Sequence, residues 1–255
     1  AELMAERGVP TLRIDGREPP TQSAQRLHAW ILDISDSAVV SPQAALRDRL
    51  MNIPETDTQS SGQRVRRKPR LPYASFHTRR FSVLRHQAQR DTVKRLEHFG
   101  LTDSVAAGKT VLDLGSCTGG LLLQLSNLPI RRGVGIDCDR EGVAVARQIA
   151  RLSGLDQIEF VVADIDRLNS KRLGKFDLVF CLTPGDYVQN HDRLYRLLAN
   201  VTKERLYFEA NSDCDIARTS KQLELAGFQK IIHLGISRDH IDPANNNRPT
   251  LIATK

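Results

Sequence analysis

The sequence predicts an α/β fold: a doubly wound, mostly parallel seven-stranded sheet with a C-terminal antiparallel hairpin, preceded by a basic helical N-terminal extension. Three observations lead to this prediction. A loop with three glycines joins a short apolar run to a helical run within residues 111–125. From residue 109 onward, β-prone and helical segments alternate regularly, as they do in parallel sheets covered on both faces. Two β-like runs separated by a turn-rich stretch close the chain.

The composition is typical of a soluble globular protein, with 40% hydrophobic and 26% charged residues among 255. No apolar run approaches the ~18–20 residues that a membrane span needs, and no signal-peptide pattern is present. We therefore expect a cytoplasmic protein without a membrane partner. The four cysteines form no Cys-x-x-Cys pair, which argues against a zinc knuckle or a disulfide scaffold. No metal site is predicted.

Positive charge is concentrated in one segment. The chain carries a formal net charge of +7, while residues 64–95 hold eleven Lys or Arg and one acid, so this segment is +10 and the rest sums to −3. Such a segment suits an anionic partner, either RNA or a phosphorylated small molecule. A solvated linker and helix face is the alternative interpretation.

Residues 1–51 are predicted as a βα/helical extension and are a candidate for the end of another domain, fused to or associated with this one. A strand is expected over 9–15, a helix over 21–32, and a second helix over 42–51 with Ser41 as its N-cap. Because the chain begins with Ala rather than Met, we expect a processed product or a piece of a longer protein. Residues 52–70 are polar and rich in helix breakers, which predicts a mobile basic linker.

Residues 71–255 are predicted to form the main domain. Its first element is a helix over about 79–99, because Phe81, Leu84, Ala88, Val93 and Leu96 recur at spacings that give one apolar face. Such a helix would cover a ligand site, with Tyr73, Gln87, Gln89 and Arg90 as candidates to line it. Surface or packing roles are the more common outcome for residues of these types.

The alternating segments follow from residue 109. Strands are predicted over 110–114, 132–136, 158–162, 176–182, 204–209, 228–236 and 249–254. Helices are predicted over 119–127, 140–152, 190–200 and 213–226. In such a fold the parallel strands bring their following loops to one carboxyl edge of the sheet, where ligands bind.

The glycine-rich loop reads Asp-x-Gly-x-x-x-Gly-Gly, with Asp113 before its first glycine, Gly115. It differs from the dinucleotide-binding Gly-x-Gly-x-x-Gly, because Cys117 stands where the second glycine would admit a pyrophosphate, and it lacks the Lys-Ser/Thr of a P-loop. The loop resembles the first motif of the class I, Rossmann-like S-adenosylmethionine (SAM) dependent methyltransferases.

Two further acids strengthen this resemblance. Asp137 ends the strand over 132–136, about where an acid in nucleotide-binding units accepts hydrogen bonds from ribose hydroxyls. Asp164 matches the position at which this family binds the adenine amino group. Capping of the following helix is the alternative for both acids. The resemblance implies SAM as cofactor, held by Asp113, Gly115, Ser116, Cys117, Thr118, Gly119, Asp137, Cys138, Asp164, Ile165 and Cys181.

The acceptor side is less defined. Enzymes of this family that methylate adenine or amide nitrogens carry Asn/Asp-Pro-Pro-Tyr/Phe after the fourth strand, whereas this chain has Thr-Pro-Gly-Asp-Tyr at 183–187. A hydroxyl acceptor needs a general base, for which Glu209, Asp186 and His191 are the candidates. Arg248 is a candidate to bind an anionic acceptor.

The resemblance therefore implies a SAM-dependent methyltransferase. Its first predicted reaction is O-methylation of a small metabolite, sugar or natural-product intermediate. An RNA (tRNA/rRNA) methyltransferase is the second reading. An NAD-dependent oxidoreductase and a non-catalytic SAM-binding module remain open.

Overall fold

The computed structural model describes residues 41–53, 55–58, 64–67, 71–183 and 188–255. The strand and helix expected within residues 9–32 lie outside the described residues. The chain divides into two compact units, residues 1–45 and Leu46–Lys255. The second unit contains the sheet and all of the candidate functional residues.

Seven strands form one sheet in the order β10-β11-β9-β8-β5-β6-β7. All neighbouring strands run parallel except β11, which lies antiparallel between β9 and β10. The strands span Thr110–Leu114 (β5), Arg132–Asp137 (β6), Ile158–Val162 (β7), Phe176–Leu182 (β8), Thr202–Glu209 (β9), Lys230–Ile236 (β10) and Pro249–Thr254 (β11). The predicted fold class is confirmed, and most predicted strand boundaries agree to within two residues.

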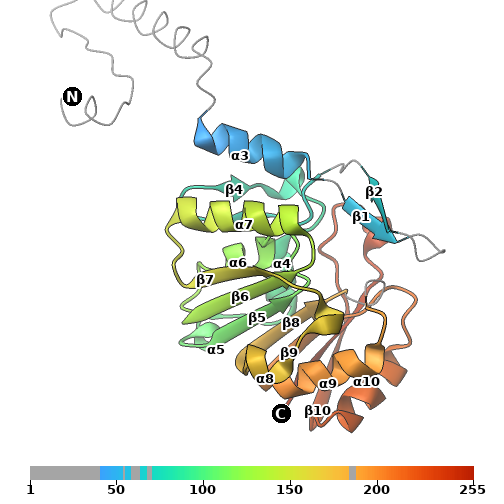
Figure 1. The fold of residues 1–255 in the computed structure, drawn as a ribbon. Coiled ribbons are helices and arrows are strands. Elements are labelled where there is room, and N and C mark those ends of the chain that lie inside the picture. Colours follow the sequence, from blue (N-terminus) through green and yellow to red (C-terminus); the bar gives the residue numbers. More distant parts are fainter. Residues whose placement is uncertain (1–40, 54, 59–63, 68–70, 184–187) are drawn as a thin grey trace, which may run out of the picture. The chain divides into compact units, whose positions relative to one another are not determined.

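Helices cover both faces of this sheet, with α6 and α7 on one side and α8, α9 and α10 on the other (Figure 1). They span Thr92–His98 (α4), Asp103–Ala106 (α5), Gly120–Leu125 (α6), Arg140–Ser153 (α7), Ser170–Leu173 (α8), His191–Val201 (α9) and Ile216–Leu225 (α10). No helix in the described part of the chain combines the length and apolar character that a membrane crossing requires.

Each face of the sheet packs into its own apolar core. Along β8, Phe180 points to the α6/α7 side, where its ring stacks on Tyr207 with centroids 4.6 Å apart. The neighbouring Val179 and Cys181 point to the α9 side. Strands buried on both faces read as continuous apolar runs, which is why the sequence marks them clearly. Burial of each such side chain contributes roughly 1.5–3 kcal/mol.

The helix predicted over 79–99 is wrong except for its last third. Its first part contains the short strand Ser82–Val83 (β4), which pairs with Phe76–His77 (β3) just before the predicted range, and a 3₁₀ turn at Arg85–Gln87 (η1). The helix α4 starts only after Asp91, whose carboxylate caps it by accepting from the Lys94 amide. Just before this cap, the amides of Gln89 and Arg90 donate to the carbonyls of Pro72 and Tyr73, which keeps the chain extended.

The predicted linker also contains regular structure. Glu55–Thr58 (β1) and Arg64–Arg67 (β2) pair as an antiparallel hairpin. The helix expected over 42–51 is present as Pro42–Met51 (α3), and the Ser41 hydroxyl accepts from the Ala44 amide at 3.1 Å. Its later residues Leu46 and Leu50 are buried in the core of the second unit. That unit therefore begins well before residue 71.

Candidate functional site

The glycine-rich loop joins β5 to α6 at the carboxyl edge of the sheet. Gly119 has φ +79°, and a Cβ there would lie 2.5 Å from Cζ of Phe160, so both backbone and packing require glycine. Gly115 has φ +82° and is exposed, with no atom within 4 Å of the position that a Cβ would take. The loop is therefore tightly built at its end and open at its start.

Asp137, at the end of β6, fixes this loop. Its Oδ2 accepts from the Cys117 amide at 2.7 Å, and its Oδ1 accepts from the Asp139 amide at 2.8 Å. Burial raises the pKa of Asp137, while these backbone N–H groups oppose the rise. The backbone of Cys138 also hydrogen-bonds to this carboxylate, whose two oxygens together offer about four lone-pair positions, so acceptor capacity remains. That capacity fits a ligand with two adjacent hydroxyls.

Asp113 lies at the end of β5 with 3% of its surface exposed. Its carboxyl group has no hydrogen-bond partner among the described side chains, although it faces Arg95 and Asp137. Burial raises the pKa of Asp113 to about 7; Arg95 lowers it and Asp137 adds to the rise. A buried, unpartnered carboxyl beside an open loop fits a ligand that carries a cation.

This burial gives a pH-dependent stability that Asp113→Asn should remove. The unfolded chain ionises Asp113 near pH 3.8 and the folded protein near pH 7, so the stability that the protonated group provides is lost as the pH rises between these values. We expect the free energy of unfolding of the ligand-free variant to rise relative to that of the wild type over this range, by on the order of 4 kcal/mol above pH 7. Urea unfolding of both proteins from pH 4 to 8 measures the difference, and a constant difference would contradict the assignment.

The other predicted cofactor residues take different positions. The Ser116 hydroxyl is buried without a hydrogen-bond partner among the described residues, and Thr118 is also buried. Burial, then Asp137, raises the pKa of the Cys117 thiol to about 12. Cys138 is exposed.

Cys181 was also predicted to contact the cofactor, and this contact stays a prediction. Its side chain is completely buried in the core on the α9 side, because successive β8 residues alternate between the two faces of the sheet.

Asp164 and Ile165 follow β7. Asp164 caps the 3₁₀ turn Ile165–Arg167 (η2) by accepting from the Asp166 amide at 3.0 Å, which is the alternative role weighed for it. Its side chain is 44% exposed, and its other oxygen lies 3.8 Å from Nε of Arg167. The carboxylate therefore remains accessible at the same edge as Asp137.

A buried ion cluster occupies the carboxyl ends of β9 and β10 and consists of Arg90, Arg95, Glu209, Asp239 and Arg248. Nη2 of Arg95 donates to both oxygens of Glu209, at 2.9 and 3.0 Å. Nη1 of Arg90 donates to Oδ1 of Asp239 at 2.8 Å, and Nε of Arg95 lies 3.0 Å from Oδ2 of Asp239.

Arg248 is the partly accessible member of this cluster, with its side chain 28% exposed. Its Nη1 lies 3.3 Å from Oε1 of Glu209, 3.3 Å from the Tyr73 hydroxyl and 3.2 Å from the Thr183 hydroxyl. Thr183 directly follows β8 and has φ +57°, a conformation that a β-branched residue rarely adopts. Such strain of about 1–3 kcal/mol is frequent at functional sites.

The three candidate general bases differ in their surroundings. Glu209 is completely buried between arginines, so it has no surface with which to meet an acceptor, and the base role predicted for it is not the one its surroundings favour. Asp186 lies outside the described residues. His191, the first residue of α9, is exposed, and its ring lies 6.5 Å from that of Tyr195. No interaction within the described residues joins it to the ion cluster.

Sequence reasoning did not single out Arg95 or Asp239. Arg95 was counted only in the basic segment, and Asp239 follows β10 without any motif around it. Arg90 and Tyr73 were predicted to line a ligand site, but under a helix that forms only from Thr92 onward. No spacing in the sequence joins these side chains, because the Tyr73–Arg248 contact spans 175 positions.

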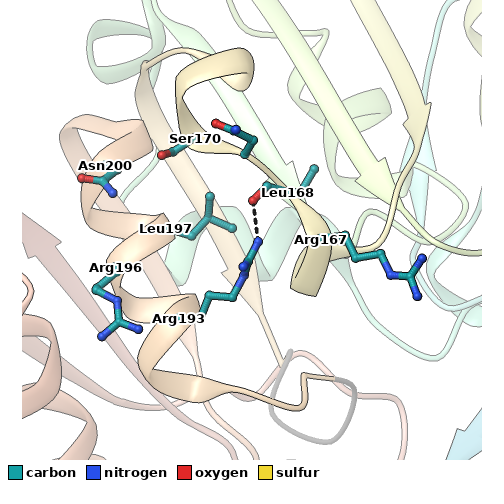
Figure 2. Close-up of a pocket in the computed structure, with 8 residues that line it drawn as sticks. Arg167, Leu168, Ser170, Arg193, Arg196, Leu197 and Asn200 are labelled. Atoms are coloured by element: carbon teal, nitrogen blue, oxygen red, sulfur yellow. Dashed lines mark hydrogen bonds between the residues drawn. The ribbon is translucent and has the colours of Figure 1, made fainter.

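A cavity of about 370 Å³ lies elsewhere, between the chain around α8 and the helix α9 (Figure 2). Its walls include Arg167, Arg193 and Arg196, and Nη2 of Arg193 donates to the Leu168 carbonyl at 2.8 Å. None of the residues predicted to hold a cofactor or to act as a base lines it. This cavity is therefore separate from the candidate site.

Comparison with known families gives one match over more than half of the chain. Residues 106–241 match the family model described as "Methyltransferase domain". The matched range starts before β5 and ends just after Asp239 and His240, so it includes the glycine-rich loop, Asp137 and Asp164.

Curated relatives match over a shorter range. Ubiquinone biosynthesis O-methyltransferase of Escherichia coli O7:K1 (strain IAI39 / ExPEC) is 31% identical over 96 residues, 38% of this chain and 39% of the relative. The protein of the same name from Acinetobacter baumannii (strain AYE) is 30% identical over 100 residues, 38% of this chain and 40% of the relative. The match thus spans about two fifths of the length of these relatives.

Solved structures share the fold. The N-terminal domain of EvdMO1 with S-adenosylhomocysteine (SAH) bound superposes with a TM-score of 0.58 at 18% identity, covering 83% of this chain and 94% of that one. Magnesium protoporphyrin IX methyltransferase (ChlM) from Synechocystis PCC 6803 with bound SAM gives 0.53 at 23% identity, covering 64% of this chain and 78% of that one.

Proposed function

This chain belongs to the methyltransferase-domain family, whose members are SAM-dependent, and from that premise we propose that it transfers a methyl group from SAM to a hydroxyl oxygen of a small acceptor. One observation carries the cofactor assignment. Asp113, which is buried, and Asp137, which is half-buried, flank an open glycine-rich loop, and each retains capacity that a bound ligand would use. SAM supplies an electrophilic methyl group on a positively charged sulfur.

The residues of the loop and of the strand ends would each bind a different part of the cofactor. Asp137 would accept from both ribose hydroxyls while it continues to hold the Cys117 and Asp139 amides. Asp113 would pair with the amino group of the methionine part, which relieves the unfavourable burial of its charge. Gly115 leaves the room that this part needs, and Asp164 and Ile165 would meet the adenine.

Two observations support a hydroxyl acceptor of small size. The curated relatives are named as O-methyltransferases, and the motif of adenine or amide nitrogen methylation is absent after β8. RNA is the second candidate because of the basic segment 64–95. Two of that segment's arginines, Arg90 and Arg95, are buried in ion pairs and are therefore unavailable to an RNA backbone. The positive charge that this segment can offer to RNA is therefore smaller than its sequence suggests.

Methyl transfer from SAM with a labelled methyl group into a cell extract tests the proposal. The extract is separated by size after incubation, with and without ribonuclease, and label in small molecules that carry hydroxyls is the expected result. Asp137→Ala serves as the background control. Label in large, ribonuclease-sensitive material would overturn the small-acceptor assignment, and polyanion binding would then weaken steeply as salt rises.

A further inference from the structure

Three guanidinium groups surround the ring and hydroxyl of Tyr73. Nη1 of Arg248 lies 3.3 Å from its Oη, and the guanidinium carbons of Arg90 and Arg95 each lie 5.8 Å from its ring centroid. The carboxylates in this cluster are Glu209 and Asp239. Three cations thus face two anions, and an ionised Tyr73 would make the count equal.

The surroundings of Arg90 also indicate that the cluster lacks one negative charge. Only 1% of the Arg90 surface is exposed, and the Nε and Nη2 atoms of Arg90 have no hydrogen-bond acceptor among the described residues. A buried guanidinium that is only partly paired is costly, so the cluster favours any further negative charge within reach. Asp113 faces Arg95 from β5, whereas Tyr73 lies beside all three arginines and can supply this charge.

We propose that Tyr73 is the general base that removes the proton from the acceptor's hydroxyl group. This inference rests on the proposed O-methylation. Glu209 and Asp239 are enclosed by the cluster, whereas Tyr73 is only half-buried and Arg248 is 28% exposed. Arginine cannot accept a proton in proteins, so Tyr73 is the reachable member of the group that can.

The position of Tyr73 suits this role. Arg248 links its hydroxyl to that of Thr183, the first residue after β8. The carboxyl end of β8 adjoins that of β5, where the glycine-rich loop begins, so Tyr73 lies at the edge where cofactor and acceptor would meet.

The charges around Tyr73 favour its ionised form. Burial raises the pKa of Tyr73 and Glu209 adds to the rise, but Arg95, Arg90 and Arg248 together outweigh them, and the pKa lies below its usual value near 10. Burial and Arg90 lower the pKa of His240, which disfavours a further positive charge beside the cluster. Asp113 faces Arg95 from β5, so its own ionisation would weaken that arginine's effect.

The proposed step balances as follows in atoms and charge. The acceptor O–H bond breaks and its proton goes to the Tyr73 phenolate oxygen, while an oxygen lone pair forms the bond to the methyl carbon. The carbon–sulfur bond breaks and its electron pair remains on sulfur. The products are the methyl ether, neutral SAH and neutral Tyr73, which then returns its proton to solvent.

Tyr73→Phe tests the assignment without requiring a known acceptor. The ultraviolet absorbance of phenolate is followed against pH in the wild type and in the variant, and their difference isolates Tyr73. We expect this difference to titrate below the usual tyrosine pKa near 10, because the surrounding arginines lower the pKa of Tyr73. Burial raises the pKa values of Tyr195 and Tyr207, so these residues would titrate later. A Tyr73 midpoint at or above that of free tyrosine would overturn the proposal.

The same titration in an Arg248→Gln protein tests whether Arg248 lowers the pKa of Tyr73. Loss of this cation should move the Tyr73 midpoint to higher pH, whereas a purely structural Arg248 would leave the midpoint in place. Tyr207→Phe is the matched control, because it removes an identical hydroxyl near Arg205 and Glu204 at the opposite edge of the sheet.

The kinetic test uses labelled SAM and the small-molecule fraction of a cell extract. Tyr73→Phe should lower kcat by about 10²-fold or more with SAH affinity unchanged, and Tyr207→Phe should behave as the wild type. Equal rates for wild type and Tyr73→Phe would overturn the base assignment alone. A wild type that labels no hydroxyl compound would instead overturn the proposed function.

Discussion

Glu209→Gln is expected to lower the free energy of unfolding by about 3–5 kcal/mol. Glu209 has no exposed surface, and its carboxylate faces Arg95 at 2.9 Å, Arg248 at 3.3 Å and Arg90 at 4.0 Å. The amide keeps the shape of the side chain but removes the one carboxylate charge that faces all three guanidinium groups. Removal of one partner from a buried ion pair is costly because the remaining charge cannot be hydrated.

Urea unfolding at neutral pH measures this loss, and the same strand offers a matched control. Glu204 pairs with Lys109 at 2.5 Å, but its side chain is 44% exposed. Exposed ion pairs contribute only about 0–1 kcal/mol, so Glu204→Gln should change stability little. Equal effects of the two substitutions would show that the buried cluster is not what stabilises this end of β9.

Asp137→Ala is expected to weaken SAH binding by about 100-fold or more. The substitution removes the acceptor for the Cys117 and Asp139 amides, so the loop loses the bonds that hold it at 2.7 and 2.8 Å. It also removes the acceptor proposed for the ribose. Hydrogen bonds to a charged group contribute about 1.5–3 kcal/mol each, and ~2.7 kcal/mol corresponds to that factor in affinity.

Isothermal titration with SAH measures the affinity directly. Asp139→Asn is the control, because Asn caps a helix about as well as Asp and should preserve the Asp139 bond to the Glu141 amide. Its affinity should stay within a few-fold of the wild type. An Asp137→Ala protein that binds SAH normally would exclude Asp137 from the cofactor site.

The two outcomes are independent, because the residues serve different parts of the site. Glu209 and Asp137 lie on β9 and β6, which β8 and β5 separate in the sheet. A destabilised Glu209→Gln protein should therefore still bind SAH below its unfolding midpoint. The Asp137→Ala protein should have a lower affinity for SAH under conditions in which it remains folded.

The core strands and the glycine-rich loop at their carboxyl edge were predictable because their signals are local. A strand buried on both faces is a continuous apolar run, and the next residues are then placed at the carboxyl edge by topology alone. Asp113 and Asp137 could be assigned to one site on this basis. The segment before β5 could not, because the spacing of Phe81, Leu84 and Ala88 fits a helix, while bonds to residues 72 and 73 hold the chain extended.

The sequence by itself thus determined the parallel sheet, the turn at Gly115 and Gly119, and the acids at the ends of β5 and β6. Only the tertiary structure decided what Tyr73, Arg90, Arg95, Glu209 and Arg248 do. These residues come from different elements, and their pairing depends on burial and on distances across the fold rather than on spacing along the chain. A charge in a basic segment looks exposed in the sequence, whereas in this protein Arg90 and Arg95 are buried and form ion pairs with Asp239 and Glu209.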